Sequence, residues 1–375
     1  MEPHIPTTPE GQRRIVGCMS GTSLDGLDIA CVEITGHGRE LKVDSIQHAH
    51  MGFGPLGARL KRALKEPLSA AEWTSLAHDL GQLHAEAICT AWPLTRLDLV
   101  AAHGQTLYHA PPLSQQLLNP WPIAQALQVA VVCDLRGADL SAGGEGAPIT
   151  PYADRVLYGE HIGPEGLVIV NLGGFANATV LTEETAVGFD CSPCNHLLAA
   201  VARKSLGQPF DPDGETAMGG TPDDELAESL AHTISQLNAE GRSGGSGDEG
   251  IELVISTNTS LDASDHLATI ADAIARAIAK SLPQTPASKK ICLAGGGARN
   301  AALRQAIQRH CRGEVVLSDQ LGVPIEAREA AAMAILGAMA ADGMPITNPD
   351  TTGHISTPLR AGLWVLPHPH SMNHL

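Results

Sequence analysis

Aromatic residues are scarce in this chain of 375 residues, and Phe, Trp and Tyr together make up 3% of it. The core must therefore be built mostly from Ala, Leu, Ile and Val, and the 43% of hydrophobic residues suffice for a sizeable core and two domains. No apolar run approaches the ~20 residues of a membrane span. The first twelve residues lack the basic start and apolar stretch of a secretory signal. We therefore expect a cytoplasmic protein without a membrane partner.

Basic residues are also few relative to acidic ones. The chain has 24 Lys and Arg against 41 Asp and Glu, a formal net charge of -17. Such a surface repels nucleic acid and anionic membranes, so we expect no nucleic-acid partner. An anionic ligand would have to be held locally, by backbone N–H groups, a few arginines or a metal ion.

Common metal and redox patterns are missing as well. The 17 histidines include no H-E-x-x-H. Cys191 and Cys194 form the one C-x-x-C, and a zinc ribbon would need a second pair at matching spacing. A thioredoxin-like redox role is an alternative for this isolated motif. Most of the other cysteines stand among apolar residues, where Cys acts as a small core residue.

What is present is an alternation of strand and helix patterns, which predicts an α/β fold. A hairpin is expected at residues 14–34, and a helix begins near Ser69, where Ser69 and Glu72 form a capping-box pattern. The other predicted segments are strands in 97–106 and 128–148, a hairpin in 166–182, strand then helix in 185–206 and 289–309, a long helix around 267–278, and an Ala-rich buried helix in 326–340. Residues 238–250 read as a flexible insertion and 368–375 as a frayed tail.

The turn of the first hairpin, within GCMSGTSLDG at 17–26, is unusually rich in small polar residues. Gly, Ser and Thr let successive N–H groups converge on an anion without obstruction from Cβ atoms. Thr22 and Ser23 add hydroxyl donors, and Asp25 and Asp28 are placed to hold Mg²⁺ directly or through water. A long hairpin loop of turn formers is the alternative, and neither a Walker motif nor G-x-G-x-x-G fits.

Similar loops recur along the chain. Residues 21–28, 143–146, 173–177 and 295–300 each follow an apolar strand, and Asp190 stands alone after another. One glycine-turned hairpin opens each half, which suggests a duplicated domain. Together these features indicate phosphoryl transfer between two lobes. The arrangement resembles that of the sugar kinase, Hsp70 and actin group, and the resemblance implies two phosphate hairpins, one adenosine loop and one catalytic Asp.

Several motifs resemble those of one family in this group. Residues 19–28 read MSGTSLDGLD and match MSGTSxDGxD, a highly specific signature, and residues 103–106 match HGQT. Residues 134–136 resemble DFR, 142–148 AGGxGAP, 171–177 NxGGxAN, and 295–300 GGGAxN. Over nearly its whole length the chain resembles the anhydro-N-acetylmuramic acid kinase family.

The resemblance implies a two-lobed, actin-like ATPase fold with an interlobe cleft that closes on its ligands. The expected lobes are residues 1–155 and 156–340, with a tail at 341–375 that returns to the first lobe. Implied ligands are an anhydro-sugar, ATP and Mg²⁺, and a homodimer is implied by resemblance alone. The implied nucleotide contacts are Gly21, Thr22, Ser23, Leu24, Asp25, Gly26, Leu27, Asp28, Gly173, Gly174, Asn177, Gly295, Gly296, Gly297 and Asn300.

The implied reaction opens the 1,6-anhydro ring of 1,6-anhydro-N-acetylmuramic acid with water and phosphorylates O6 from ATP, in the recycling of bacterial cell-wall sugars. Asp190 is the expected base, and a helix N-cap is its alternative. Arg136 is expected to meet the lactyl carboxylate or the sugar, or else to form a surface ion pair.

The implied sugar contacts also include His103, Gln105 and Glu326. A buried His that satisfies a loop is the alternative for His103. Glu326 is expected at the start of the Ala-rich helix, where the helix dipole favours an acidic residue in any case.

The chain departs from the family at two places. Residues 189–195 read FDCSPCN where FDTGPGN is usual, and PPKSTG is not recognisable after residue 214. These changes bear on substrate and rate, and two further readings stay open. One is a related 1,6-anhydroglucose kinase, and the other is a non-catalytic sensor of sugar or nucleotide.

Overall fold

The computed structural model describes residues 11–21, 24, 26–239, 260–283 and 289–367. The chain forms two compact units. Unit 1 contains residues 1–159 and 326–375, and unit 2 contains residues 160–325. The expected insertion at 238–250 lies for the most part, and the expected tail at 368–375 entirely, outside the described residues. None of the helices in the described ranges has the length and apolar character that a membrane crossing requires.

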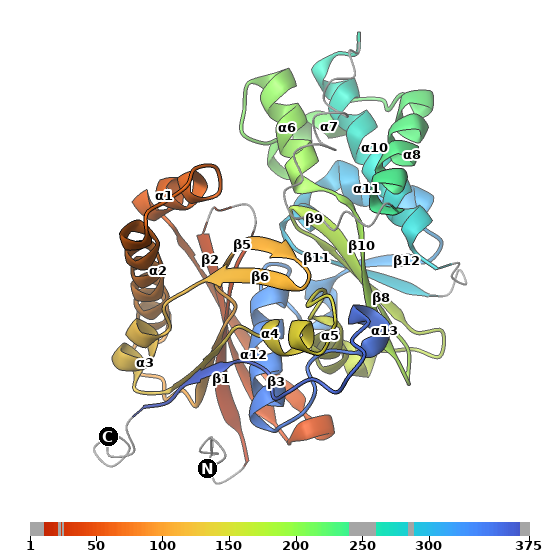
Figure 1. Cartoon of the computed structure of the whole chain (residues 1–375). Helices are drawn as coiled ribbons and strands as arrows, with labels where there is room; N and C mark the ends of the chain where they lie inside the picture. Colours follow the sequence, from red (N-terminus) through yellow and green to blue (C-terminus); the bar gives the residue numbers. More distant parts are fainter. Residues whose placement is uncertain (1–10, 22–23, 25, 240–259, 284–288, 368–375) are drawn as a thin grey trace. The chain divides into compact units, whose positions relative to one another are not determined.

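Unit 1 is built on a mixed sheet with the strand order β13-β7-β4-β1-β2-β3, of which β1, β2 and β3 are labelled in Figure 1. β1 pairs antiparallel with β2 and parallel with β4, β2 pairs antiparallel with β3, and β4 pairs parallel with β7. The strands are β1 (Arg13–Ser20), β2 (Gly26–Thr35), β3 (Lys42–Gly52), β4 (Leu99–Ala102), β7 (Ala130–Cys133) and β13 (Leu363–Val365), and a separate hairpin is formed by β5 (Gln105–Ala110) and β6 (Leu113–Leu117).

Helices complete unit 1. One face of the sheet, including Val16 and Cys18, forms a buried apolar cluster with α1, α2 and α3. The helices are α1 (Pro55–Ala63), α2 (Ala70–Ala91), α3 (Trp121–Leu127), α4 (Gly137–Ser141), α5 (Pro151–Tyr158), α12 (Arg328–Ala341) and α13 (Pro349–Thr352), with the 3-10 helix η1 (Gly38–Glu40). α2 begins as expected, because Ser69 and Glu72 form both hydrogen bonds of a capping box.

The Ala-rich helix α12 packs on β1, β2 and β4. A Cβ atom at Gly17 would overlap the backbone of Ala330 and Ala334, and one at Gly337 would lie 2.5 Å from the Cβ of Ala101. The helix therefore approaches the sheet more closely than large side chains allow. The expected second lobe of 156–340 included this segment, but long-range contacts with the first sheet assign α12 to unit 1. Near the C-terminal end of the described residues, β13 pairs antiparallel with β7 in the sheet of unit 1.

Unit 2 has a second mixed sheet, with the order β10-β9-β8-β11-β12. One face of it packs against α6, α8, α10 and α11 (Figure 1). The strands are β8 (Leu167–Leu172), β9 (Phe175–Leu181), β10 (Ala186–Pro193), β11 (Lys290–Ala294) and β12 (Glu314–Leu317). The helices are α6 (Asn195–Leu206), α7 (Glu215–Met218), α8 (Asp224–Ala239), α10 (Ala263–Ser281) and α11 (Ala301–His310), with the 3-10 helices η2 (Gly159–His161), η3 (Pro212–Gly214), η4 (Gly296–Arg299) and η5 (Ser318–Leu321).

The two sheets repeat one topology. In each, the first strand forms an antiparallel hairpin with the second, the second pairs antiparallel with the third, and two parallel strands follow on the other side of the first. Counted within each unit, the shared order is 3-2-1-4-5. The duplicated arrangement expected from the two glycine-turned hairpins is therefore present.

A buried carboxylate joins α10 to α11 in unit 2. Asp272 is 2% exposed and accepts hydrogen bonds from Arg276, Arg309 and His310, each at 2.8 Å. Burial alone would raise the pKa of Asp272, but the three donors outweigh it and hold that pKa below its ordinary value. The carboxylate therefore stabilises the fold above its unfolded pKa of about 4, and the contribution is lost as the pH falls through the lower folded pKa.

We expect Asp272→Asn to lower the melting temperature at pH 7, and the difference from the wild type to shrink as the pH falls below about 4. Thermal unfolding followed by circular dichroism between pH 7 and pH 3 measures this. Glu225→Gln on the exposed face of α8 serves as the control. A difference that stays constant over the whole range would mean that the charge of Asp272 contributes nothing.

Candidate functional site

Among the described residues, two buried polar atoms without a partner border the β1–β2 turn of unit 1, one at the end of β1 and one at the start of β5. Ser20 and Gln105 are 2% and 1% exposed, and in the described part of the chain Ser20 Oγ and Gln105 Oε1 have no hydrogen-bond partner. Gln105 Nε2 donates to the carbonyl of Gly21 at 3.4 Å, so its side chain faces the turn. A buried polar atom without a partner costs free energy, which indicates that a ligand or water bonds here. Thr22, Ser23 and Asp25 lie outside the described residues.

Other predicted residues of this turn are placed. Leu24 is buried with a φ of 54°, and its N–H donates to the carbonyl of Gly21 at 3.4 Å. Leu27 is buried in the apolar cluster under α1 and α2. A Cβ atom at Gly26 would meet the ring of His50, so glycine is needed there for close packing. The structure thus gives Leu24, Gly26 and Leu27 packing contacts that shape the turn.

Asp28 follows on β2 and faces two histidines of β3. Its Oδ1 lies 2.9 Å from His50 Nδ1 and 3.3 Å from His48 Nε2, and its side chain is 36% exposed. Within the described residues no cluster of three or more His, Cys, Asp or Glu is arranged to hold a metal ion. Mg²⁺ bound with nucleotide phosphates needs only one or two carboxylates, so a partly exposed hard oxygen beside the turn fits such a role.

His103 and Arg136 form a fixed pair in unit 1. Arg136 Nε donates to His103 Nε2 at 3.0 Å, and His103 Nδ1 lies 3.0 Å from the carbonyl of Gly104. Burial and then the nearby Arg136 lower the pKa of His103 to about 3, so the ring is neutral and carries its proton on Nδ1. Both ring nitrogens are thus used inside the protein. The alternative of a buried His that satisfies a loop agrees with this geometry, and His103 orients Arg136.

The start of α12 contains an acidic residue that the sequence analysis did not select. Glu326 is half-buried in the turn before the helix, which begins at Arg328. Glu329 is half-buried in the first turn, and burial together with Asp28 raises its pKa against the opposing effects of Arg328 and Arg136. The pKa of Glu329, the acidic residue of α12, therefore depends on the charges of Asp28 and Arg136. A charge inside an otherwise apolar helix was the signal that could have identified it.

In unit 2 the β8–β9 turn is held by the start of α6. Asn195 N donates to the carbonyl of Gly173 at 3.1 Å, and Cys194 N and His196 N donate to that of Gly174 at 2.9 and 3.3 Å. In a trans peptide the N–H points opposite to the carbonyl, so the N–H groups of Gly174 and Phe175 point away from α6. Such a pair of outward N–H groups suits a phosphate.

Asp190 lies in a row of polar residues across three strands. Asn177 of β9 pairs with Asn171 of β8 on one side and with Asp190 of β10 on the other. Directly opposed residues share one face of a sheet, and here Ala176 and Ala178 take the helix-covered face, so the polar row takes the other. Asp190 is exposed and is followed by a β-bulge before Ser192. Bulges often redirect a side chain beside an active site.

The helix-cap alternative for Asp190 does not hold. α6 begins at Asn195 and its N-cap position is Cys194. Asp190 is a strand residue four positions earlier, so it does not cap α6. The sequence suggested a loop between strand and helix at this point, but β10 runs through to Pro193 because it pairs with β9 up to Phe175.

The triple-glycine loop packs against the end of β8. The backbone of Gly295 has a φ of +79°, and a Cβ atom there would lie 2.8 Å from Asn171 Oδ1. Asn171 is 2% exposed, and its Oδ1 has no hydrogen-bond partner in the described part of the chain. A Cβ atom at Gly297 would lie 2.8 Å from the carbonyl of Leu172. Gly296, by contrast, has open space. The Asn300 side chain caps α11 by accepting from Leu303 N at 2.9 Å, so its nucleotide role remains a prediction.

The C-x-x-C motif behaves as core. Cys191 and Cys194 form no disulfide, and both are 0% exposed. Burial raises the pKa of both thiols, that of Cys194 to about 12. Since the thiolate is the reactive form, neither thiol is poised for redox chemistry.

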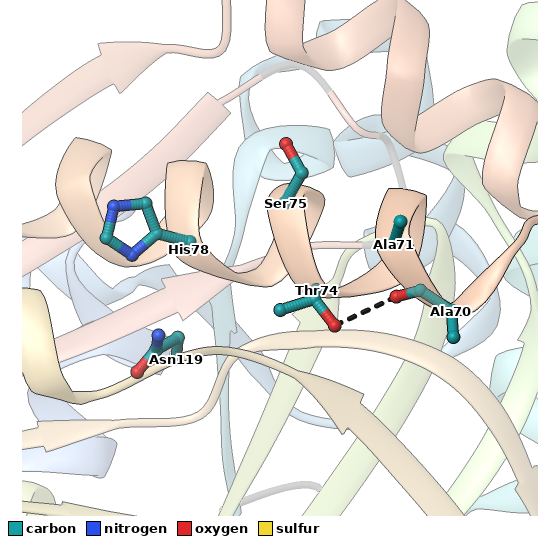
Figure 2. A pocket seen from close by; sticks show the side chains of 6 residues that line it. All are labelled: Ala70, Ala71, Thr74, Ser75, His78 and Asn119. Carbon is teal, nitrogen blue, oxygen red and sulfur yellow. Dashed lines mark hydrogen bonds between the residues drawn. The ribbon is translucent and has the colours of Figure 1, made fainter.

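A shallow depression on α2 contains none of the residues singled out above (Figure 2). Its hydroxyl groups are used locally: Thr74 Oγ1 donates to the carbonyl of Ala70 at 2.8 Å, and Ser75 Oγ donates to Asp79 at 3.3 Å. It is lined by Ala70, Ala71, Thr74, Ser75, His78 and Asn119. We do not assign the chemistry to it.

Two sheets of one strand order, each opening with a glycine-turned hairpin, are the architecture of ATP-dependent sugar kinases of the actin-like fold, and the chain is of this class. The family model of anhydro-N-acetylmuramic acid kinase matches residues 13–362. The chain belongs to this family.

Relatives that are named anhydro-N-acetylmuramic acid kinase agree over nearly the whole chain. The protein of Parasynechococcus marenigrum is 35% identical over 367 residues, which cover 90% of this chain and 96% of that protein. The protein of Methylobacterium nodulans is 34% identical, covering 94% of this chain and all of that protein, and the protein of Salinibacter ruber is 33% identical, covering 91% and 94%.

Similarity to solved structures is weaker. The activator of 2-hydroxyisocaproyl-CoA dehydratase from Clostridium difficile has a TM-score of 0.43 at 13% identity, covering 88% of this chain and 96% of that one. A glucokinase of the ROK family from Streptomyces griseus has a TM-score of 0.37 at 11% identity, covering 86% and 99%. The fold assignment rests on the sheet topology and the family, not on these values.

Proposed function

We propose that this kinase opens the ring of 1,6-anhydro-N-acetylmuramic acid with water and phosphorylates O6 from ATP, giving N-acetylmuramic acid 6-phosphate and ADP. The identity of the substrate is supported by its relatives, which are named anhydro-N-acetylmuramic acid kinase. The observation that carries the chemistry is the place of Asp190: exposed, at a bulge, beside Asn177 and excluded from capping α6. A non-catalytic sensor would have no need for an exposed carboxylate at that position.

In the proposed mechanism Asp190 accepts a proton from a water molecule that attacks the anomeric carbon. The new C1–O bond forms as the C1–O6 bond breaks, and the freed O6 attacks the γ-phosphorus of ATP. ADP leaves, and the proton on Asp190 passes to solvent. Base and phosphate acceptor must be aligned in one complex, because O6 becomes nucleophilic only as the ring opens.

Phosphate binding is assigned to the glycine turns. The N–H groups of Gly174 and Phe175 point away from α6 and would donate to phosphate oxygens, as would the β1–β2 turn beside Ser20 and Gln105. Mg²⁺ would be held by Asp28, directly or through water, and would neutralise charge on the transferred phosphoryl group.

The sugar contacts are assigned to unit 1. Arg136 would bind the lactyl carboxylate through the paired N–H groups that guanidinium offers. Glu329, whose pKa responds to the charges of Arg136 and Asp28, joins Gln105 and Glu326 as a candidate partner of the sugar hydroxyls. His103 acts through Arg136.

The cellular setting is part of the same proposal. The reaction belongs to cell-wall sugar recycling in the bacterial cytoplasm, and the net charge of -17 supports the absence of a nucleic-acid partner. A homodimer is proposed from family resemblance, and light scattering on the purified protein measures it.

The test compares two sugars. We expect 1,6-anhydro-N-acetylmuramic acid to stimulate ADP release, measured by a coupled assay, and 1,6-anhydroglucose to do so far less, because it lacks the carboxylate. In ¹⁸O-water the label should appear in the new hydroxyl group at C1, because water attacks that carbon. The oxygen of the phosphate ester should stay unlabelled, because it is the O6 of the substrate. Equal turnover of both would favour the anhydroglucose alternative. If neither sugar stimulates ADP release, the assignment of the protein as an enzyme is overturned.

A further inference from the structure

The loop of residues 142–146 in unit 1 is braced by a distant part of the chain. Glu145 N donates to the carbonyl of Thr352 at 2.8 Å, and Ile355 N and Ser356 N donate to that of Ala142 at 3.1 and 3.3 Å. The segment 348–356, which includes α13, therefore runs beside the glycine-rich loop that follows α4 (Figure 1).

A buried carboxylate lies at the centre of this brace. Asp139 of α4 is 1% exposed, and its Oδ2 accepts from Gly146 N at 2.8 Å. Its Oδ1 accepts from Thr352 Oγ1 at 2.7 Å and lies 3.1 Å from His354 Nδ1. A Cβ atom at Gly144 would overlap Oδ2, which explains glycine there. One carboxylate thus fixes the loop and the C-terminal segment together.

The same loop holds the arginine assigned to the substrate. The carbonyl of Gly146 accepts from Arg136 Nη1 at 2.6 Å, and Arg136 Nε donates to His103 at 3.0 Å. These two acceptors are uncharged, so both bonds orient the guanidinium without neutralising it. Gly146 bonds through its N–H to Asp139 and through its carbonyl to Arg136. A movement of Asp139 therefore reaches Arg136 across a single residue.

We propose that Asp139, Thr352 and His354 are positioning residues that hold Arg136 in the orientation that binds the substrate carboxylate, and so set the preference for a carboxylate-bearing anhydro-sugar. The proposal rests on the function proposed above. It assigns a role in specificity to a segment more than 200 residues away from Arg136 in sequence. The three residues act through Arg136 and do not touch the sugar themselves.

The central experiment is Thr352→Val, which keeps the shape of the side chain and removes the hydroxyl that donates to Asp139. Calorimetry measures the affinity for 1,6-anhydro-N-acetylmuramic acid and for 1,6-anhydro-N-acetylglucosamine, the same sugar without the lactyl group. We expect affinity for the first to fall by about tenfold, as a misplaced binding group costs roughly 10–100-fold. Affinity for the second sugar and for ATP should not change, because neither uses the carboxylate contact.

A double-mutant cycle separates positioning from general destabilisation. On an Arg136→Met background Thr352→Val should have no further effect, since there is no guanidinium left to orient. Thr352→Ser should restore the wild-type preference because it returns the hydroxyl. Ser141→Ala on α4, whose hydroxyl bonds only the carbonyl of Ala138 among the described contacts, is the matched control. Should Thr352→Val not fold, His354→Ala enters the same cycle.

The outcomes distinguish this proposal from the one on which it rests. Equal losses for both sugars, or effects that add with Arg136→Met, would overturn the positioning role while leaving the kinase function intact. A wild-type protein that binds neither sugar would instead overturn the proposed function.

Discussion

Asp190→Asn is expected to lower turnover by about 10²–10⁴-fold, the usual contribution of a general base. Asparagine has the same size but accepts no proton from water, so ring opening and phosphoryl transfer should fall together. Affinities for ATP and sugar should persist, because the glycine turns and Arg136 are untouched. Steady-state kinetics and calorimetry on the purified variant measure the two parts.

The matched control is Glu184→Gln, which removes an exposed carboxylate from the far end of the same β9–β10 hairpin. It should leave turnover unchanged. Near-normal activity in Asp190→Asn would remove this residue from the mechanism, and the helix cap is no longer available as its other role, since α6 is preceded by Cys194.

Asp154→Ala is expected to destabilise the fold by about 3–5 kcal/mol. Asp154 and Arg328 are 0% and 1% exposed, and they form a bidentate pair between α5 and α12 that includes a 2.9 Å bond from Arg328 Nε. Loss of the carboxylate leaves a buried guanidinium with only Thr150 Oγ1, at 3.1 Å, among the contacts described here. Chemical denaturation gives the change in unfolding free energy.

An exposed pair of the same chemistry provides the comparison. Asp79 and Arg59 are 34% and 45% exposed, so Asp79→Ala should cost no more than about 1 kcal/mol. The double variant Asp154→Leu with Arg328→Met should recover most of the stability, because no charge then remains buried. A loss in Asp154→Ala as small as that in Asp79→Ala would show that water reaches Arg328.

The hairpins and the capping box of α2 are predictable because their causes are local. Glycine-rich turns between β-branched runs mark β1–β2 and β8–β9, and Ser69 with Glu72 marks a helix start. The membership of α12 in unit 1 is not predictable in this way. It depends on Gly17 of β1 meeting the backbone of Ala330 across more than 300 residues of chain, and on Gly337 meeting Ala101 of β4. Nothing in the local pattern of the helix shows these partners.

The residues of the candidate site likewise differ in how far the local sequence predicts their surroundings. Asp190 is identifiable as an isolated carboxylate after a strand, yet only the register shows it beside Asn177. That the two ring nitrogens of His103 bond Gly104 and Arg136 is visible only in the structure, and its contact with the sugar stays a prediction. Glu326 was selected from the family resemblance and was expected to begin the helix, but the helix begins two residues later at Arg328, which puts Glu329 in its first turn.

Unit 2 is a continuous stretch of chain, whereas unit 1 is assembled from both ends of the sequence. During synthesis residues 160–325 leave the ribosome before α12 exists, so unit 2 has all its parts while the sheet of unit 1 still lacks its buried helix and its edge strand β13. The face that holds Gly17 and Ala101 stays uncovered until residues 328–341 emerge. Over the same interval the carboxylate of Asp154 lacks its ion-pair partner Arg328. Nascent unit 1 therefore exposes apolar surface to chaperones and to aggregation until α12 and β13 have been made, whereas unit 2 is complete before them.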